Sequence, residues 1–408
     1  MTLASELHRE LEELGRAGLR RVLRRWDRVE GVRVESATDG ALLNFSSNDY
    51  LGLAAHPLVV RAASEATANF GAGATASRLI CGSMAPHHEL EAALAGLKGA
   101  ESALAFSSGY ATAMGVIPAL VGRGDFVVID RLAHASLVDG ARLSGATLRV
   151  FRHNDVGDLE RILRWVSARR QRRDSGENGR IARVLVVTES VFSMDGDTAP
   201  IAELVALKER HDAWLMVDEA HATGVLGPNR SGWIEAQGMT GRVDIPMGTL
   251  GKALGSAGGF VVGSAVLRDF LVHRGRSFVF STAPPPGVAA AATAAIAVVR
   301  SPEGADRVGV LWKRIREAQE GLCAMGWRLP EPQSPILPLV VGSEAVAVEL
   351  SDALRSAGIL VPAIRFPTVP RDKARLRITL TAGHRREDVE RFLAVLGAAA
   401  QRLGIRPG

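Results

Sequence analysis

The sequence offers few amines for covalent chemistry, because only five of its 49 basic residues are lysines. One of them, Lys252, lies in the glycine-rich run Gly248–Gly255, among small and apolar residues. Burial lowers the pKa of a lysine amine toward the range in which the amine is nucleophilic. We therefore predict that Lys252 is a reactive amine. The alternative is an ordinary surface lysine in a loop.

A carboxylate and an imidazole follow another apolar run. Asp218 and His221 come directly after Trp214–Val217, which has the composition of a buried strand. In open α/β sheets, ligands bind outside the carboxyl ends of the strands, so both side chains fall where a site is expected. Taken alone, an aspartate in this place is more often a helix cap.

A third candidate element lies in the run Phe106–Ala111, where small residues separate a strand pattern from a helix pattern. Backbone N–H groups at such a helix start can hold a phosphate. Gly109 and Tyr110 would supply these groups, and Tyr110 could also line the pocket. A strand, a Ser-Gly turn and a helix are common in proteins, so this signal is weak by itself.

Together these parts match the needs of one cofactor. Pyridoxal phosphate requires a lysine for a Schiff base, a carboxylate beside its ring nitrogen and a cradle for its phosphate. Only a nearby carboxylate keeps the pyridine nitrogen protonated at neutral pH, and this charge makes the ring an electron sink. The combination is far more specific than any of its parts.

The elements that must position these residues have an α/β pattern between about residues 55 and 285. Short apolar runs alternate with helical patterns, which predicts a mostly parallel sheet covered by helices on both faces. The predicted strands are Ser102–Phe106, Phe126–Ile129, Thr147–Phe151, Arg183–Thr188, Trp214–Val217, Asp244–Met247 and Gly259–Val262.

The two ends of the chain have other patterns. Residues 3–28 carry apolar positions at near-helical intervals, which predicts a helical arm, and two short strand patterns around Asp39-Gly40 predict a hairpin. After the Pro284–Pro286 run, an alanine-rich helix leads into a mixture of strands and helices. We predict an arm and hairpin at 1–54, a large domain at 55–286 and a smaller α+β domain at 287–408.

The composition argues against several classes of protein. The net charge is +5, but 44 acidic residues are interspersed with the basic ones, which favours a mixed surface over a nucleic-acid-binding one. The dense run Arg169–Arg173 has no interleaved aromatic residues and leads into an expected exposed loop at 174–179. Two cysteines without metal-ligand spacing predict no disulfide framework and no metal site, and fit the reducing cytoplasm.

Neither a targeting signal nor a membrane span is expected. The N-terminal segment is amphipathic and charged, without the apolar core of a signal peptide. The longest smooth apolar stretch, Gly287–Val299, is well short of the roughly 20 residues that a membrane span needs. We therefore expect a cytoplasmic protein with a buried helix in this stretch.

Six motifs, in chain order, resemble those of the α-oxoamine synthases. They are Asn44–Leu53, Ser77–Gly82, Thr188–Asp197, Asp218–His221, Thr249–Lys252 and Ser281–Pro285. The resemblance extends from about residue 18 to about residue 395. It implies a fold-type I pyridoxal-phosphate transferase that condenses an amino acid with an acyl thioester and releases carbon dioxide.

The C-terminal part of the resemblance bears on the substrates. Phe366–Pro370 and Ala374–His384 resemble members that condense L-alanine with a pimeloyl thioester, carried on coenzyme A or an acyl carrier protein, in biotin biosynthesis. Arg371–Lys373 departs from the family, which often has a glycine here, so the shape of this substrate loop is in doubt. The alternatives are 2-amino-3-ketobutyrate ligase, 5-aminolevulinate synthase and serine palmitoyltransferase, or, from another class, a non-catalytic basic binding protein.

The resemblance also assigns roles around the cofactor ring. Lys252 is expected to bond to the cofactor and later to remove the Cα proton, and Asp218 to pair with the pyridine nitrogen. His134 is expected to stack on the ring and to contact substrate. Ser193 and His221 are expected near the phenolic oxygen of the ring, where hydrogen bonds tune basicity.

The remaining roles concern the phosphate and the substrates. The resemblance implies a phosphate held by Gly109, Tyr110 and Thr249 and, across the interface of a homodimer, by Thr282. Arg377 is the candidate for the amino-acid carboxylate, since its planar fork matches that group. Arg375 lies two positions away on the same strand face, so spacing alone does not choose between them. The substrate contacts implied in addition are Asn48, Thr368 and one of Arg20 and Arg21.

Overall fold

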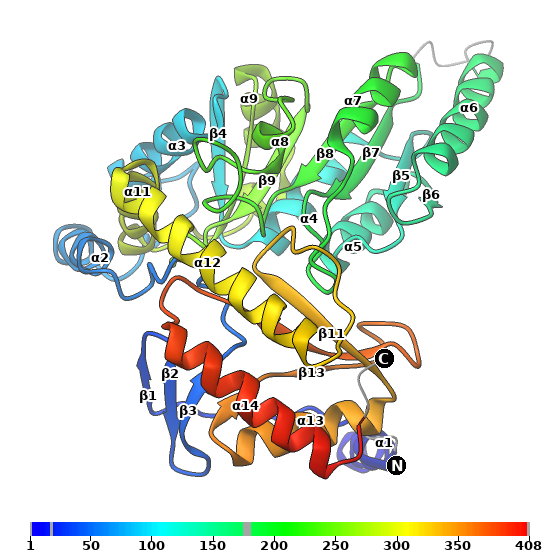
Figure 1. The fold of residues 1–408 in the computed structure, drawn as a ribbon. Coiled ribbons are helices and arrows are strands. Elements are labelled where there is room, and N and C mark those ends of the chain that lie inside the picture. Colours follow the sequence, from blue (N-terminus) through cyan, green and yellow to red (C-terminus); the bar gives the residue numbers. More distant parts are fainter. Residues whose placement is uncertain (1, 17–18, 174–180, 406–408) are drawn as a thin grey trace.

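The computed structural model describes residues 2–16, 19–173 and 181–405, which form a large upper part and a smaller lower part (Figure 1). The large part is built on a seven-stranded sheet in the order β4-β10-β9-β8-β7-β5-β6. Its strands are β4 (Ser102–Phe106), β5 (Phe126–Asp130), β6 (Thr147–Phe151), β7 (Val184–Glu189), β8 (Trp214–Asp218), β9 (Ile245–Thr249) and β10 (Gly259–Gly263).

All seven predicted strands are present, within a residue or two of the expected bounds. Strands β5 to β9 pair in parallel, whereas β10 is antiparallel to both β4 and β9. Every residue of β5 and β7 is buried, which explains why these strands read as continuous apolar runs.

Helices cover both faces of this sheet. One face packs against α4 (Gly109–Leu120), α5 (Ala135–Ser144), α9 (Ala265–Arg274) and α10 (Arg276–Val279). The other packs against α6 (Val156–Arg173), α7 (Ile201–Arg210) and α8 (Trp233–Ala236), and at its β4 end against α2 (Pro57–Phe70), α3 (Ala85–Lys98) and α11 (Pro286–Arg300). The predicted α/β architecture is therefore confirmed.

The smaller part joins residues from both ends of the chain. One sheet has the strand order β1 (Arg28–Glu30), β2 (Arg33–Ser36), β3 (Gly40–Asn44) and β12 (Ile359–Leu360), and β12 pairs in parallel with β3. A second sheet contains β11 (Ile336–Gly342), β14 (Ala374–Thr379) and β13 (Ala363–Ile364). The helices here are α12 (Pro302–Ala324), α13 (Glu344–Ser356) and α14 (Arg386–Arg402).

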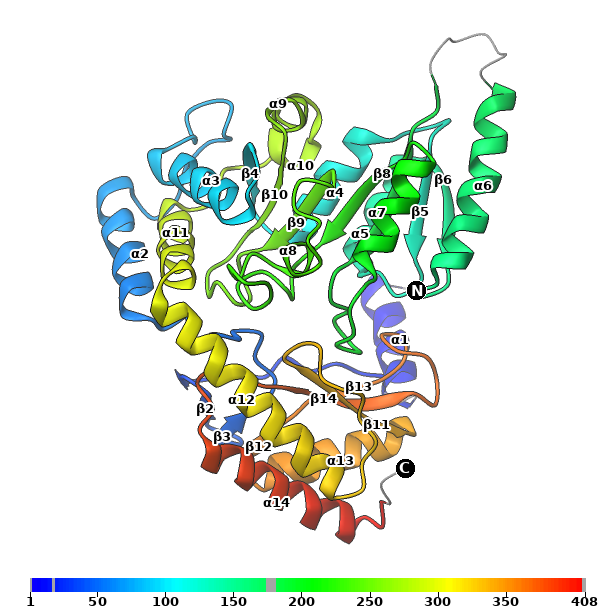
Figure 2. The ribbon, with the colours of Figure 1, turned by 45° about the horizontal axis from the view of Figure 1, so that its top comes forward.

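Helices α11 and α12 connect the two parts. Figure 2 shows α11 beside α2 in the large part and α12 running from there onto the small part. The division at 1–54, 55–286 and 287–408 stays a prediction.

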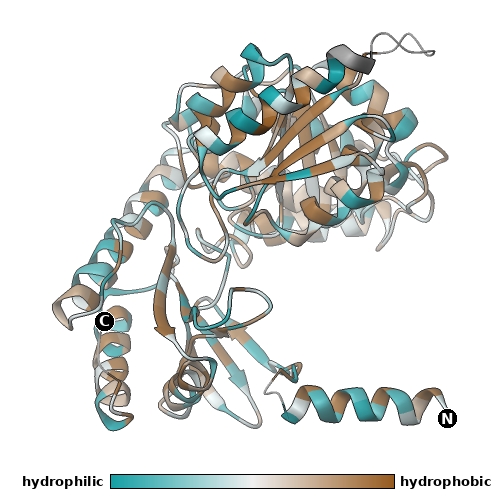
Figure 3. Cartoon of the chain, turned by 90° about the vertical axis from the view of Figure 1, so that its right-hand side faces the viewer, coloured by the Kyte–Doolittle hydropathy of each residue, from teal (hydrophilic) through white to brown (hydrophobic). Residues whose placement is uncertain are grey.

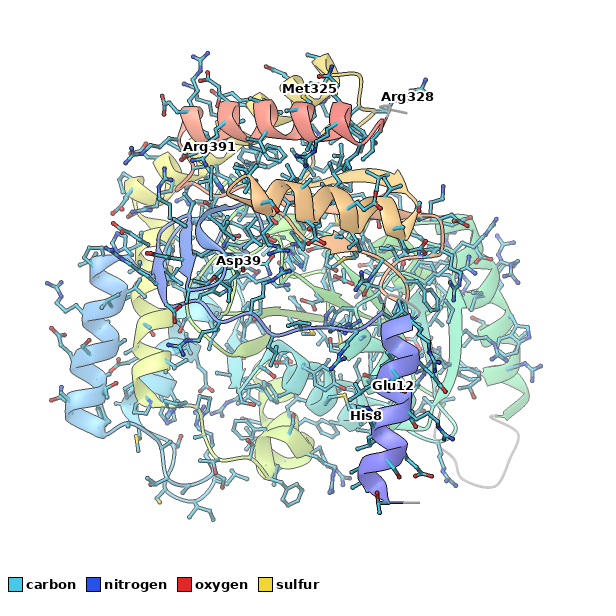
Figure 4. All side chains as sticks on the ribbon, turned by 90° about the horizontal axis from the view of Figure 1, so that it is seen from below. His8, Glu12, Asp39, Met325, Arg328 and Arg391 are labelled. Carbon is cyan, nitrogen blue, oxygen red and sulfur yellow. The ribbon has the colours of Figure 1, made fainter. Side chains whose placement is uncertain are left out.

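The N-terminal helix α1 (Leu3–Arg16) is shorter than predicted and stands apart from the rest of the chain (Figure 3). It has no buried residue, and His8 and Glu12 form an ion pair along it (Figure 4). The helix predicted over 3–28 is wrong at its C-terminal end, because residues 19–26 are not helical. A longer helix would place Arg20 and Arg21 one turn from Arg24 and Arg25, where like charges repel.

The remaining expectations concern a membrane span, a metal site and the loop after α6. In the described part of the chain, no helix is long and apolar enough to cross a membrane. Among the same residues, no cluster of histidine, cysteine or acidic side chains could hold a metal ion. The predicted exposed loop at 174–179 lies outside the described residues.

Candidate active site

The candidate site lies at the carboxyl ends of three neighbouring parallel strands. Glu189 ends β7, Asp218 ends β8, and Lys252 follows the end of β9. The strand register pairs Glu189 with Asp218 and Asp218 with Met247. The predicted residues Asp218, His221 and Lys252 are thus brought to one edge of the sheet.

The amine of Lys252 contacts a buried imidazole. Its Nζ lies 2.7 Å from Nε2 of His221. Burial lowers the pKa of Lys252 to about 8, although the nearby carboxylates of Asp218 and Glu189 act in the opposite direction. An appreciable fraction of this amine is therefore unprotonated at neutral pH, as a nucleophile or base requires.

Tyr50 extends this contact into a chain of hydrogen bonds. Its hydroxyl lies 2.5 Å from Nδ1 of His221 and donates to Oδ1 of Asn48 over 3.3 Å. Burial lowers the pKa of His221 well below its usual value and raises that of Tyr50 to about 12, so both groups stay neutral. With the tyrosine proton on Asn48, this network assigns the imidazole proton to Nδ1 and leaves Nε2 to accept from Lys252.

Two buried carboxylates lie beside the amine. Oδ1 of Asp218 accepts the Ala220 amide at 2.9 Å, and no ion pair to Asp218 occurs among the described residues. Burial raises the pKa of Asp218, and it raises the pKa of Glu189 well above its usual value with help from the charge of Asp218. A buried carboxylate without a cationic partner suits a protonated ring nitrogen.

His134 borders the same edge from the next strand. It caps α5, where its Nδ1 accepts the Ser136 amide at 3.2 Å, and its own amide donates to Oε1 of Glu189 at 2.6 Å. The side chain is exposed, but the surrounding protein still desolvates it enough to lower its pKa. An exposed neutral imidazole can stack on a flat ring, so the predicted role of His134 stays a prediction that this placement allows.

The start of α4 has free backbone donors. The Ser108 side chain accepts the Ala111 amide, while the amides of Gly109 and Tyr110 have no partner in the described part of the chain. A Cβ at Gly109 would make ordinary van der Waals contact with Thr249, 3.6 Å from its Cβ, so the glycine leaves more room at this corner than a larger residue would. Two free amides form a fitting cradle for a phosphate. The Thr249 hydroxyl beside them already donates to the Gly258 carbonyl at 2.8 Å, so its contact with a phosphate stays a prediction.

The side chains of three predicted cofactor-binding residues make no contact with this cluster in the described part of the chain. The hydroxyl of Tyr110 is exposed and donates to Oδ2 of Asp139 at 2.9 Å. Thr282 is exposed and forms a backbone bridge with Ser77. The carbonyl of Ser193 accepts Nε of Arg377 at 2.6 Å, whereas no partner of its hydroxyl is described. The cofactor roles of these three residues stay predictions.

The structure separates Arg375 from Arg377, which the sequence could not do. Both are buried in β14. Arg375 forms an ion pair with Asp195, whereas Arg377 bonds to the Ser193 carbonyl and to Oδ1 of Asn48, with no carboxylate partner among the described residues. Arg377 therefore retains an uncompensated charge that can bind an anionic substrate, and Asn48 lies beside it. The substrate contacts of both residues stay predictions.

The residues predicted to bind the acyl substrate share one cavity of about 680 Å³. Arg20, Arg21 and Thr368 line it, together with Leu11 and Leu14 of α1. Both arginines lie at the cavity, so the choice between them remains open. Its mixture of apolar and cationic walls suits an acyl chain that ends in a carboxylate.

Tyr50 and Glu189 are functional candidates that the sequence reasoning did not select. Both lie inside recognised motifs, at Asn44–Leu53 and Thr188–Asp197. An acidic residue after the apolar run Val184–Thr188 is the same signal that selected Asp218, so Glu189 could have been found. Tyr50 carries no comparable signal, because its partner His221 is 171 residues away.

Comparisons with known proteins agree with this geometry. The family described as aminotransferase class I and II matches residues 41–396. The chain is 49% identical over 390 residues to an 8-amino-7-oxononanoate synthase of Anaeromyxobacter dehalogenans, covering 95% of this chain and 94% of that protein. It is 43% identical over 407 residues to the synthase of the same name from Symbiobacterium thermophilum, and this match covers 99% of this chain and 100% of that protein.

A solved structure is similar over the same length. A serine palmitoyltransferase variant from S. paucimobilis, with a bound PLP-myriocin aldimine, superposes with a TM-score of 0.89 at 31% identity. The match covers 99% of this chain and 100% of that one.

Proposed function

Because this chain belongs to the class I and II aminotransferase family, we propose that it condenses L-alanine with a pimeloyl thioester, as an 8-amino-7-oxononanoate synthase does in biotin biosynthesis. The chain is a pyridoxal-phosphate enzyme of fold type I. The observation that carries the proposal is the amine of Lys252, whose pKa burial lowers to about 8, in contact with His221 and near Asp218. The choice of substrates rests on the similarity to the two relatives of that name.

The residues present fit pyridoxal 5′-phosphate. Lys252 would hold its aldehyde carbon, Asp218 its ring nitrogen, and the Gly109 and Tyr110 amides with Thr249 its phosphate. When bound, the cofactor supplies a carbonyl that bonds to amines and a ring that accepts the electrons of a broken bond at Cα. The buried oxygen of Asp218 and the open corner at Gly109 are the structural features that support this fit.

Lys252 then acts on protons. Its amine, with a pKa of about 8, takes a proton from Cα of L-alanine and later returns one to the same carbon of the product. Nε2 of His221 accepts a hydrogen bond from this amine and fixes where its lone pair lies. Tyr50 holds the tautomer of His221 that makes this possible.

Arg377 orients the amino acid. Its free guanidinium binds the carboxylate that leaves as carbon dioxide, and Asn48 completes the contact. His134 lies at the opening of the site, where it covers the reacting groups against water. We propose that the acyl chain occupies the cavity at Arg20, Arg21 and Thr368.

We further propose that the protein is a homodimer with its active site at the interface, to which Thr282 contributes. Apolar residues around Thr282 support this assembly, because Ile80 is 79% exposed and Phe280 is 71% exposed. Exposed apolar side chains in one area mark interaction surfaces. The mass in solution, measured by light scattering, tests this proposal, and a monomer would contradict it. The two free cysteines support a reducing compartment, the cytoplasm.

An acyl-donor panel tests the proposed reaction. L-alanine, glycine and L-serine are each combined with pimeloyl, acetyl, succinyl and palmitoyl thioesters, on coenzyme A and on an acyl carrier protein, and free thiol is measured. The expected result is the highest kcat/KM for L-alanine with pimeloyl. Faster turnover of glycine, or of serine with palmitoyl as in the structurally similar transferase, would overturn the proposal. A chain without a cofactor absorption band would favour a non-catalytic protein.

A further inference from the structure

A histidine outside the predicted site bridges two carboxylates. His153 lies in the turn between β6 and α6, and β6 is the edge strand beside β5 (Figure 1). Its Nδ1 is 3.0 Å from Oδ1 of Asp130, at the end of β5, and its Nε2 is 2.7 Å from Oδ2 of Asp197. The side chain of Asp130 is fully buried. The ring of Phe192 packs edge-on against the imidazole at 4.3 Å.

This geometry requires a charged imidazole. A neutral imidazole has one N–H, so it cannot donate to two carboxylates at once, whereas imidazolium donates from both nitrogens. Partial burial lowers the pKa of His153, but the hydrogen bonds and charges of Asp130 and Asp197 outweigh burial and raise it to about 10. His153 is therefore a permanent cation at neutral pH.

One side of the bridge reaches the segment before His134. Asp130 accepts the Leu132 amide at 2.8 Å with the same oxygen that contacts His153, and its carbonyl accepts the Ala133 amide at 3.2 Å. The chain then continues directly to His134. Asp130 and His153 thus fix the turn that carries the imidazole at the opening of the site.

The other side reaches the turn that holds Arg377. Asp197 closes the turn Ser193–Gly196, because its carbonyl accepts the Phe192 amide at 3.0 Å. Its carboxylate also accepts Nδ2 of Asn154 at 3.0 Å. Within this turn, the carbonyl of Ser193 accepts Nε of Arg377 at 2.6 Å. A shift of the turn therefore moves the guanidinium.

We propose that His153 is a positioning residue whose imidazolium fixes the turn Ser193–Gly196, and through it Arg377, so that it sets the affinity for the amino-acid carboxylate without touching the substrate. This inference rests on the proposed function, because it takes Arg377 as the carboxylate ligand. It concerns the binding of the amino acid and not the proton transfers at Lys252.

The test compares His153→Gln and Asp197→Asn with the wild-type holoenzyme. The dissociation constant of L-alanine is measured from the absorbance change of the bound cofactor, without an acyl donor. We expect about tenfold weaker binding in His153→Gln, because the turn is no longer held from both sides, and about threefold weaker binding in Asp197→Asn. The kcat and the KM for the pimeloyl thioester should stay within about twofold.

His211→Gln is the matched control. His211 lies at the end of α7 and contacts the Ser167 hydroxyl at 3.2 Å, and among the described residues no carboxylate bonds to its side chain. Its substitution should leave L-alanine binding unchanged.

Unchanged L-alanine binding in His153→Gln would overturn the inference, as would an equal loss for both substrates and kcat. If His153→Gln does not fold, L-alanine binding by Asp197→Asn decides whether the inference holds, because this substitution keeps the shape of the side chain and removes only its charge. A wild-type enzyme that binds L-alanine but does not use pimeloyl thioesters contradicts the proposed function alone, since the binding test uses no acyl donor.

Discussion

Two lysines of the large part contact buried groups, and their surroundings differ. Lys98 ends α3, and its ammonium lies 2.8 Å from both Oε2 of Glu219 and the Thr223 hydroxyl, and 2.5 Å from the Ser231 carbonyl. Each of its three protons has an acceptor. The amine of Lys252 instead contacts a neutral imidazole, and no carboxylate pairs with it in the described part of the chain.

The acidic partners of the two lysines are consecutive residues. Glu219 forms the ion pair with Lys98, whereas Asp218 lies near Lys252 with a raised pKa. A paired ammonium in the interior is held in its charged form, whereas an unpaired amine loses its proton more easily. Burial alone therefore does not make a lysine reactive. The number and charge of its acceptors do.

Replacing Lys252 should have the largest effect on activity. Lys252→Ala should lower kcat by about a thousandfold, because no other amine can exchange protons with Cα. Steady-state thiol release measures this, and a melting curve checks the fold. The exposed Lys313, replaced by alanine, should leave kcat unchanged. Retention of more than about a tenth of the activity by Lys252→Ala would remove the contrast between the two lysines.

Replacing Lys98 should affect stability instead. Lys98→Met should lower the free energy of unfolding by about 3–5 kcal/mol, because it leaves the buried charge of Glu219 without a partner. Denaturant unfolding measures the loss, and kcat per folded molecule should stay within about twofold. Adding Glu219→Gln should recover part of the stability. If Lys98→Met instead lost kcat with an unchanged unfolding curve, Lys98 would belong to the active site.

The two arginines of β14 extend the comparison to a second pair. Arg377→Gln should raise the KM for L-alanine by about 30-fold, since a charge-assisted bond contributes about 2 kcal/mol. Arg375→Gln should raise this KM less, by about tenfold at most, because Asp195 already neutralises that charge and the loss acts only through the turn Ser193–Gly196, to which Arg375 is bonded. Initial rates over a range of L-alanine concentrations measure both values. Equal effects of the two substitutions on this KM would show that the ion pair with Asp195 does not distinguish the role of Arg375 from that of Arg377.

The smallest expected effect is the pH dependence of the Lys252 amine. Only the neutral amine bonds to the cofactor, so the rate of cofactor uptake should rise with pH, by at most about tenfold per unit, and level off above the pKa of about 8. Unfolded chains keep the usual lysine pKa near 10.5, so they bind more protons, and the cofactor-free protein should become more stable between pH 8 and 10.5. Stopped-flow absorbance and melting curves measure these changes. A rate that still rises at pH 10 would contradict the lowered pKa.

Local patterns in the sequence were sufficient for the sheet and for part of the site. Apolar runs predicted all seven strands of the large sheet, because parallel strands buried on both faces have few polar residues. Since parallel strands end at one edge, Asp218 and Lys252 could be placed near each other. The helix at 3–28 was overestimated, because apolar spacing alone does not account for the repulsion between the arginines after Arg16.

What the sequence could not supply depends on distant contacts. The difference between Arg375, which is ion-paired, and Arg377, which is not, comes from Asp195, 180 residues away from Arg375. The pairing of Lys98 with Glu219 spans 121 residues, and the parallel pairing of β3 with β12 joins the two ends of the chain. The residues of such pairs are visible in the sequence, but their pairing follows from the packing of the whole chain.

The antiparallel direction of β10 has a consequence for timing. Because β10 returns beside β9, Lys252 lies in a short reversal that is closed by the Leu250 amide, which donates to the Gly258 carbonyl at 2.9 Å. The Thr249 hydroxyl donates to the same carbonyl at 2.8 Å. With its backbone held at both ends, the amine moves by rotation of its own side chain. Exchanging a proton with the bound substrate therefore needs no rearrangement of the large and small parts.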